Sequence, residues 1–379
     1  MVTRRSIAPL LALLAAACAT LGTESAGDQN LPTSNMGPFR ALLKSEDLIA
    51  APYVLDSELA HYREPAPLAL DSNPASLQVA LYAVAIDRTG GALRDAIVRT
   101  RADDARSFYG ASLSSDGQPE VVLRADQVWE GAGVHSPSLV RIGGQVLLFY
   151  AADGGIGLAL SKDGVAFQKV PAPVFQRDPT VGWETSTPTG PSVVALDDGL
   201  LHLFYAAGVS IGEATSNDGG ATWTRLDGDP STPALDPILE PSAFTPSSPD
   251  AATPFDIGQV ADPCVAPRLT PGGRVQVRVL YTGYDAPPDA PSRSSAIGFA
   301  ARYGDQGPLE RAVSEVYAVG KHEAAPGYFE WSPGAGAPAA AMLYVQEDEA
   351  SSPAYPAIAA AVTPATLTFP MPTSAATNP

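Results

Sequence analysis

Cysteine is almost absent from this sequence of 379 residues, which holds only Cys18 and Cys264. Because Cys18 lies in a short N-terminal segment, a single cysteine is left for the folded part of the chain, and an intramolecular disulfide is excluded. Cys264 lies in the segment Val-Ala-Asp-Pro-Cys-Val-Ala, where we expect a small buried side chain rather than a reactive thiol.

Basic residues are also few. The 23 Lys and Arg residues stand against 41 Asp and Glu residues, which gives a formal net charge of −18. Such an excess of acid argues against nucleic acid as a partner and against electrostatic attachment to anionic lipid. It is compatible with a neutral or a cationic ligand.

Most motifs of enzyme chemistry are missing. The sequence shows no Ser-His-Asp spacing, no glycine-rich phosphate loop, no nucleotide fingerprint and no Cys-x-x-Cys pair. Among its four histidines, His135 and His322 precede strands that we expect to line a pocket, and they are candidate ligand-binding residues. Two histidines are a weak basis for a metal site, so we predict no metal and no cofactor.

Long apolar runs are missing as well. The run from Ile7 to Ala17 has eleven residues, too few to span a bilayer, and it follows Arg4 and Arg5, so residues 1–17 are predicted to be a signal peptide. The small residues before Cys18 resemble the bacterial lipobox, which implies a lipidated Cys18. The alternative is an ordinary secretory peptide with an incidental cysteine. Either version exports the protein, and a lipid anchor would hold it in the cell envelope, at the outer membrane or cell surface.

The remaining chain divides by composition. Residues 18–40 contain few bulky apolar side chains, so we predict a flexible tether after the lipidated cysteine. Residues 41–370 are predicted to form one folded domain and residues 371–379 a C-terminal tail. We expect a monomer.

An internal repeat is the strongest feature that the sequence does have. Pro137 and Pro191 each begin a segment that continues through Phe-Tyr-Ala-Ala to an Ile-Gly pair, with six residues from tyrosine to isoleucine in both copies. The same order recurs more loosely after Pro65, Pro263 and Pro326, where this interval grows to about 14–16 residues. We interpret the longer interval as an insertion in one loop.

The repeat predicts the fold class. Each copy holds three or four short stretches with strand character, separated by Gly, Pro, Asp and Asn, and no long helical period follows the signal peptide. Repeats of 54 to 72 residues with about four strands each are typical of propeller blades. We therefore predict an all-β, five-bladed β-propeller. A two-domain β-sandwich is the rival, but it leaves five copies of one pattern unexplained.

Two turns within the repeat look structural. The segment from Ser216 to Trp223 fits the Ser-x-Asp-x-Gly-x-Thr-Trp turn known as an Asp-box, and the segment from Ser161 to Phe167 is a reduced copy. We expect Asp218 to accept hydrogen bonds from turn amides and Trp223 to pack between strands.

The third repeat carries a family resemblance. The segment Gly-Pro-Ser-Val-Val at 190–194, the Phe-Tyr-Ala-Ala strand, the Ile-Gly-x-Ala-x-Ser-x-Asp-Gly segment at 211–219 and Trp223 resemble the five-bladed propellers of glycoside hydrolase families 43, 32 and 130. The resemblance covers roughly residues 45 to 370. It is specific for the fold and weak for activity, because one fold can host many functions.

The resemblance to family 43 implies three carboxylates on innermost strands: an Asp base on the first blade, a pKa-tuning Asp on the second and a Glu acid on the third. The matching positions in this sequence are Glu64, Ser136 and Thr189. Only Glu64 is acidic, so the catalytic motif is incomplete at Ser136 and Thr189, and whether the protein is an enzyme stays open.

Other acids offer an alternative catalytic pair. Asp262 precedes a proline on the fourth blade and matches the base motif best. In a ring of five blades it could face Glu64 across the axis, with a water between them. Glu184 or Asp256 could instead reach the pocket from an entry loop. The alternative for each acid is a carboxylate that caps a turn or binds solvent.

Trp183 and Trp331 lie beside expected inner strands and are candidate platforms for a sugar ring, or else core tryptophans.

The sequence leaves three functional hypotheses. The first is binding of a glycan or other small ligand in the axial pocket without turnover. The second is an active glycosidase or glycan phosphorylase that uses Asp262 with Glu64 or Glu184. The third is a protein-interaction platform formed by the lengthened loops. The missing acids favour binding.

Overall fold

The structure is a computed structural model that describes residues 40–41, 59–69, 79–102, 119–244, 253–269, 275–304, 306–312, 315–318, 322–331, 339–347 and 356–364. The predicted signal peptide, Cys18, nearly all of the tether and the C-terminal tail lie outside these residues. None of the helices in the described part of the chain has the length and hydrophobicity of a membrane-spanning helix.

The described strands form five antiparallel sheets, four with four strands and one with five. The first sheet holds β2 (Leu59–Ala69), β3 (Val79–Asp87), β4 (Arg94–Ala102) and β5 (Glu120–Arg124). The second holds β6 (His135–Ile142), β7 (Gln145–Ala152), β8 (Gly155–Ser161) and β9 (Gln168–Lys169). The third holds β10 (Thr189–Ala195), β11 (Leu201–Ala207), β12 (Ser210–Ser216) and β13 (Thr224–Leu226).

The fourth sheet holds β14 (Gln259–Val265), β15 (Arg268–Leu269), β16 (Val275–Tyr284), β17 (Ser295–Tyr303) and β18 (Glu310–Arg311). The fifth holds β19 (Glu323–Trp331), β20 (Ala339–Glu347), β21 (Pro356–Pro364) and β1 (Arg40–Ala41). Two short 3₁₀ helices, η2 (Thr89–Gly91) and η3 (Val128–Glu130), lie in connections.

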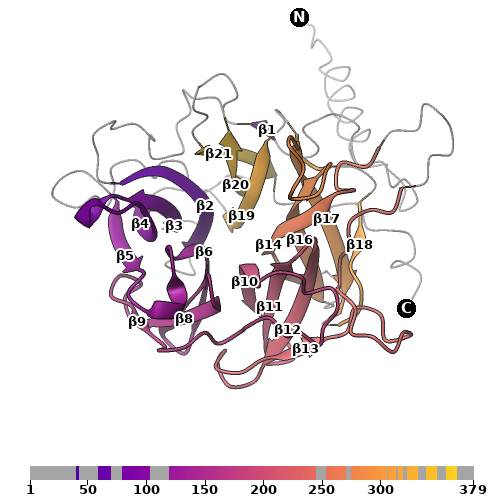
Figure 1. Ribbon diagram of the computed structural model, residues 1–379, viewed down its shortest axis with the longest axis horizontal. Coiled ribbons are helices and arrows are strands. Elements are labelled where there is room, and N and C mark those ends of the chain that lie inside the picture. Colours follow the sequence, from indigo (N-terminus) through magenta and orange to yellow (C-terminus); the bar gives the residue numbers. More distant parts are fainter. Residues whose placement is uncertain are drawn as a thin grey trace, which may run out of the picture.

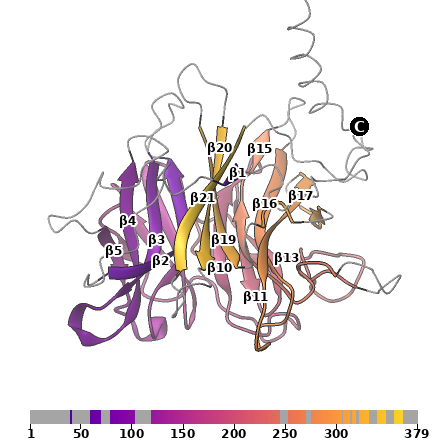
Figure 2. The same ribbon diagram turned by 90° about the horizontal axis from the view of Figure 1, so that it is seen from above.

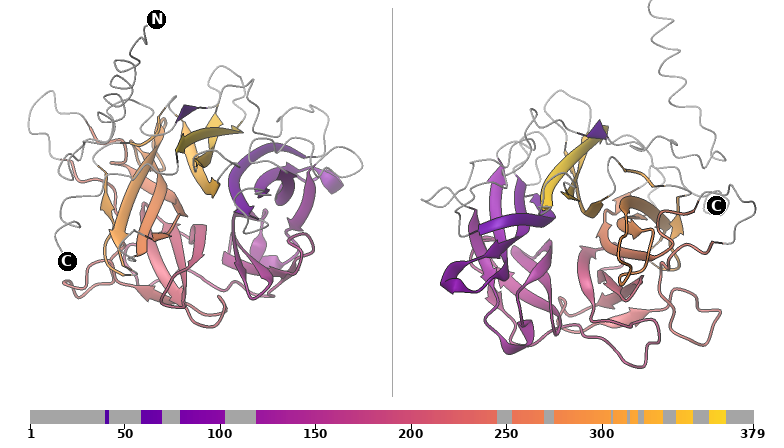
Figure 3. Two further views of the ribbon diagram at one scale, coloured as in Figure 1. Left: turned by 180° about the vertical axis from the view of Figure 1, so that it is seen from behind. Right: turned by 45° about the horizontal axis from the view of Figure 1, so that its top comes forward.

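The sheets follow one another around a ring (Figure 1). Each of the innermost strands β2, β6, β10, β14 and β19 contacts the innermost strands of both neighbouring sheets. The first and last sheets lie side by side, and Figure 3 shows them next to each other. The N-terminal strand β1 pairs with β21, so the fifth sheet is built from both ends of the described chain, as Figure 2 shows from above. The prediction of an all-β propeller fold is confirmed.

The repeat prolines mark a bulge on every innermost strand. The residues before them have left-handed backbones in all five sheets: Glu64 (φ 54°), Ser136 (φ 49°), Gly190 (φ 57°), Asp262 (φ 48°) and Ala325 (φ 49°). The ladder to the next strand shifts register at the same place in each sheet. A left-handed backbone costs a residue other than glycine roughly 1–2 kcal/mol. Since Ala325 shares it, the strain belongs to the scaffold and not to one catalytic group.

The Tyr and Ile-Gly parts of the repeat are opposite each other across two strands. Tyr150 pairs with Gly157, Tyr205 with Gly212, and Tyr281 with Gly298. A methyl group on Gly212 would lie 2.8 Å from the Tyr205 ring, so the glycine leaves room for the ring to lie across the strand. These tyrosine side chains are fully buried.

The two Asp-box turns connect neighbouring sheets. Asp218 accepts backbone hydrogen bonds from Ala221 and Thr222, and turn hydrogen bonds lower its pKa to about 2. Trp223, in the same turn, packs edge-on against Phe149 of the second sheet at 5.7 Å between ring centroids. The reduced copy in the second sheet receives the Tyr82 hydroxyl of the first sheet on the Gly164 carbonyl at 2.6 Å. These contacts agree with the structural role expected for the turns.

The longer Tyr-to-Ile intervals are only partly insertions. In the first sheet the extra residues extend β3 and β4, whose nine paired positions leave only residues 88–93 as the connection. In the fourth sheet β16 and β17 are also extended, and residues 285–294 connect them. The expectation of loops alone was wrong here, because a hairpin lengthens by continuing its ladder.

Candidate functional site

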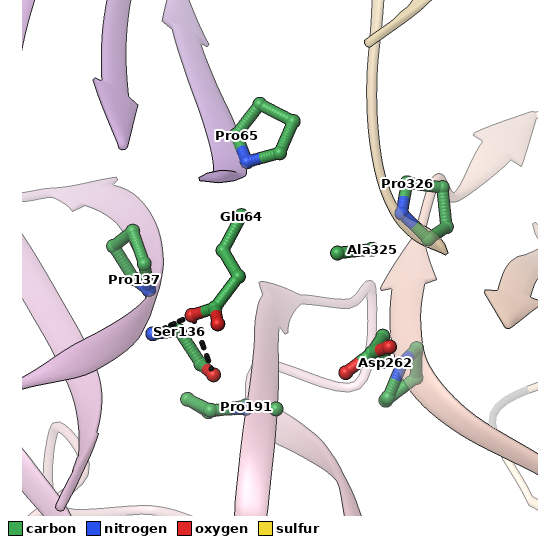
Figure 4. A pocket seen from close by; sticks show the side chains of 10 residues that line it. Glu64, Pro65, Ser136, Pro137, Pro191, Asp262, Ala325 and Pro326 are labelled. Atoms are coloured by element: carbon green, nitrogen blue, oxygen red, sulfur yellow. Dashed lines mark hydrogen bonds between the residues drawn. The ribbon is translucent and has the colours of Figure 1, made fainter. Parts of the chain in front are cut away.

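An axial cavity lies where the five bulges meet (Figure 4). Its lining consists of the five prolines and the residue before each of them: Glu64, Pro65, Ser136, Pro137, Gly190, Pro191, Asp262, Pro263, Ala325 and Pro326. Its volume is about 40 Å³. That is room for a few water molecules, whereas sites that enclose a whole small ligand measure about 300–1,000 Å³. The cavity therefore suits one substituent of a larger ligand.

Glu64 is oriented by the second sheet. Its Oε2 accepts hydrogen bonds from the Ser136 backbone nitrogen at 2.5 Å and from the Ser136 hydroxyl at 3.0 Å. Arg63 Nε lies 3.5 Å from Glu64 Oε1, and His135 Nδ1 lies 4.0 Å from Glu64 Oε2. The Arg63 guanidinium also binds Asp95. Glu64 thus has two donors and an arginine that hold it in one position.

Asp262 has a different environment. Burial and, after it, the charge of Glu64 raise the pKa of Asp262 to about 6, against the opposing effects of the Thr282 hydroxyl, Arg293 and His135. Thr282 is itself fixed, because its hydroxyl oxygen accepts the backbone N–H of Ala325 in the fifth sheet at 2.9 Å. Glu64 and Asp262 line the same cavity, and Figure 4 shows both carboxyl groups there.

The structure places Glu64 and Asp262 in the lining of one cavity. The other two family positions carry no acid. Ser136 is a hydrogen-bond donor to Glu64, and Thr189, at the start of β10, lies beside Gly190, which occupies the third place in the ring. A carboxyl with a raised pKa near a second carboxyl is an arrangement suited to proton transfer as well as to hydrogen bonding of a hydroxyl.

Glu184, a predicted catalytic acid, does not line the cavity. It is fully buried, and its carboxylate accepts the Tyr205 hydroxyl at 2.7 Å, Arg225 Nε at 2.6 Å and the Asp178 backbone nitrogen at 2.8 Å. The Tyr205 and Arg225 donors belong to the third sheet, and Asp178 belongs to the connection between the second and third sheets, which also carries Glu184. Its contacts tie the connection between the second and third sheets to the third sheet.

Asp256, a predicted ligand-binding residue, has the same place in the fourth sheet. It accepts the Tyr281 hydroxyl at 2.9 Å and pairs with Arg311 at 2.7 Å. The second sheet repeats the arrangement with Glu130, which accepts the Tyr150 hydroxyl at 2.8 Å and lies 2.7 Å from Lys169 Nζ. The second, third and fourth sheets thus each contain a buried cluster of an acid, the repeat tyrosine and a basic residue from the outermost strand.

Trp183 belongs to the cluster of the third sheet as well. Its ring stacks on Tyr205 with 5.7 Å between centroids and lies over Gly212. Trp129 stacks on Tyr150 and Phe255 on Tyr281 in the same way. The sequence carries a signal that the prediction missed: an aromatic residue followed by an acid stands eight residues before Pro137, Pro191 and Pro263. That signal marks packing rather than ligand binding.

The predicted histidines lie at two separate places. His135 begins β6, bonds the Ser136 hydroxyl at 3.0 Å and lies beside Glu64. His322 is half-buried and forms an isolated bridge with Ser295. Trp331 ends β19, and its side chain lies outside the described residues. No group of three metal-ligating side chains occurs in the described part of the chain.

Sequence reasoning also missed Arg293 and Gln259. Gln259 begins β14, three residues before Asp262, and its amide oxygen accepts Arg293 Nη1 at 2.6 Å. The Arg293 guanidinium lies 3.8 Å from the centre of the Tyr284 ring. The contact with Gln259 places Arg293 at the start of an innermost strand. We call the end of the axis at which the innermost strands begin the mouth.

Neither a family model nor a curated protein matches this sequence. Solved structures do match it at the level of fold. A putative glycoside hydrolase from Parabacteroides distasonis is 15% identical, with a TM-score of 0.58 and coverage of 88% of this chain and 98% of that chain. A second structure belongs to work on the family 130 mannoside phosphorylases, which contain glycoside hydrolases that target β-1,2 mannosidic linkages. It is 14% identical, with a TM-score of 0.59 and coverage of 90% of this chain and 99% of that chain.

A third match is a family 117 glycoside hydrolase from the marine bacterium Zobellia galactanivorans, at 15% identity, a TM-score of 0.55 and coverage of 86% of this chain and 90% of that chain. At these identities the likeness establishes the fold alone. The described chain has the β-propeller fold of these glycoside hydrolases, and two of its acids, Glu64 and Asp262, line the axial cavity.

Proposed function

We propose that the protein binds a carbohydrate at the mouth of its axial cavity, with Glu64 and Asp262 as the groups that contact hydroxyls at the bottom. The observation that carries this is the ring of ten lining residues, in which these two acids are the only ionisable side chains. Carboxyl groups beside prolines provide a few hydrogen-bonding groups on an apolar wall, as in other small-ligand sites, and a carboxylate can accept hydrogen bonds from sugar hydroxyls.

Calorimetric titration with a panel of neutral and acidic oligosaccharides tests the proposal. Glu64→Gln and Asp262→Asn should each weaken binding about tenfold or more, because a charged hydrogen-bonding group is worth about 1.5–3 kcal/mol. Asp197→Asn, at an exposed turn, is the matched control and should leave affinity unchanged. A panel without a binder, or binding that ignores both cavity variants, contradicts the proposal.

Hydrolysis by the same pair is the second candidate, favoured by the raised pKa of Asp262 beside Glu64. A carboxyl that is still partly protonated near pH 6 can donate a proton to a leaving group, while the second carboxylate activates water. Turnover of arabinosides, xylosides, fructosides and mannosides should then occur, and it should disappear in Asp262→Asn even at substrate concentrations that saturate the weakened site. Binding without turnover in the wild type would contradict this candidate and leave the first intact.

We also propose export and lipid anchoring through Cys18, on the strength of the residues before it. Metabolic labelling with a fatty acid in a bacterial host should mark the wild type and not Cys18→Ser. An unlabelled, secreted wild type would support the ordinary secretory peptide instead.

A further inference from the structure

Arg293 differs from four other half-buried or buried arginines. Arg63, Arg225, Arg302 and Arg311 each contact a carboxylate. Arg293 is half-buried too, yet within the described residues its contacts are the neutral amide of Gln259 and the ring of Tyr284. A guanidinium has five N–H donors, and one of these is used by the Gln259 amide.

The position of Arg293 is fixed by its surroundings. Gln259 is itself held, because its amide nitrogen donates to the Gly208 carbonyl in the third sheet at 3.0 Å. The connection that carries Arg293 is closed at its base, where the Ser294 backbone nitrogen donates to Asp285 Oδ1 at 2.7 Å. Stacking on a tyrosine leaves the edges of the guanidinium available to a ligand.

The fixed guanidinium lies at the mouth. Gln259 is on the same strand as Asp262 and precedes it by three residues, and the positive charge of Arg293 opposes the rise in the pKa of Asp262. Among the described residues Arg293 forms no ion pair, and the acid on which its charge acts is Asp262. The guanidinium N–H groups that Gln259 leaves unused can form charge-assisted hydrogen bonds to a carboxylate brought by the ligand.

We propose that Arg293 binds the carboxylate of an acidic sugar, which makes the axial site selective for glycans that contain uronic acid. The sugar ring lies at the mouth, its carboxylate faces the guanidinium fork of Arg293, and its hydroxyls face Asp262 and Glu64. This inference rests on the proposed carbohydrate binding and adds the class of sugar.

The test compares each acidic sugar with its own methyl ester, which keeps the ring and the hydroxyls and removes the charge. Galacturonate and glucuronate oligosaccharides and their methyl esters are titrated into the wild type, Arg293→Gln, Arg293→Lys and Lys162→Gln. Lys162 is exposed in an Asp-box turn, so its variant matches the loss of one positive charge away from the site. Asp262→Asn serves as the general binding control.

The wild type and Lys162→Gln should bind one of the acids about tenfold or more tighter than its ester. Arg293→Gln should lose this preference and bind the ester within about twofold of the wild type, while Arg293→Lys, with the charge but without the planar fork, should fall between them. Equal affinity for acid and ester in the wild type, or equal loss of both in Arg293→Gln, overturns the assignment. If neutral sugars still bind to the wild type and bind more weakly to Asp262→Asn, the proposed carbohydrate binding is supported even though the assignment of Arg293 is overturned.

Discussion

The Glu64 carboxylate of the first sheet accepts hydrogen bonds from both the backbone nitrogen and the hydroxyl of Ser136 in the second sheet. The resemblance to family 43 asks for an acid at the Ser136 position. Here Ser136 instead donates two hydrogen bonds that orient Glu64 of the neighbouring sheet. The residue that replaces the family's second carboxylate is therefore the one that fixes the position of Glu64.

We therefore expect Ser136→Ala to weaken carbohydrate binding. The alanine keeps the backbone donor and removes the hydroxyl donor, so Glu64 should lose part of its orientation, and affinity should fall about three- to tenfold for one charge-assisted hydrogen bond. Calorimetric titration measures this. Thermal melting should change little, since Ser136 is half-buried and its position in the strand is retained. An affinity equal to that of the wild type would show that Glu64 does not need this bond.

Asp262 gives a pH-dependent prediction. Its pKa is raised from 3.8 to about 6 by burial and by Glu64, so the folded state holds this proton more strongly than the unfolded chain does. The stabilisation is complete below pH 3.8 and is lost as the pH rises toward and through about 6. Asp262→Asn removes the group that must ionise, so above pH 6 it should be more stable than the wild type, by up to about 3 kcal/mol.

Urea unfolding at a series of pH values measures this difference. The two proteins should have similar stability near pH 4 and diverge between pH 4 and 7. Divergence in the opposite direction, with the variant less stable at neutral pH, would mean that the ionised carboxylate is stabilised in the fold.

The fold was largely predictable because the repeat has direct physical causes. Each innermost strand has a bulge with a left-handed residue before its proline, as at Asp262. A repeat tyrosine needs a glycine opposite it, as at Gly212. Both requirements recur at fixed positions of the repeat. The same register locates Glu64 and Asp262 before repeat prolines, which is why both line the axial cavity.

Other site predictions failed where the direction of a side chain decided the outcome. Glu184 stands near the innermost strand in the sequence, but it bonds Tyr205 and Arg225 inside the sheet. Arg293 could not be found from a motif, because its place depends on how the connection between β16 and β17 folds back onto Gln259. Sequence spacing locates a residue along a strand and leaves open which partners its side chain meets.

Glu184→Gln should destabilise the protein without a specific effect on binding. The buried carboxylate neutralises Arg225 and accepts two further hydrogen bonds, and removal of one partner of a buried pair typically costs about 3–5 kcal/mol. Denaturant unfolding should show this loss, while the exposed Asp197→Asn control stays within about 0.5 kcal/mol of the wild type. Normal stability with abolished binding or turnover would instead return Glu184 to the list of catalytic acids.

The tyrosine–glycine pairs predict a large effect from a single methyl group. The added carbon of Gly212→Ala would lie 2.3 Å from the Trp183 ring and 2.8 Å from the Tyr205 ring, and these two rings stack on each other. We expect a loss of about 1–3 kcal/mol from overpacking. Gly182→Ala is the matched control, because its methyl group would meet no atom within 4 Å. Equal unfolding midpoints for the two variants would contradict the idea that glycine at this place of the repeat exists to make room for the aromatic stack.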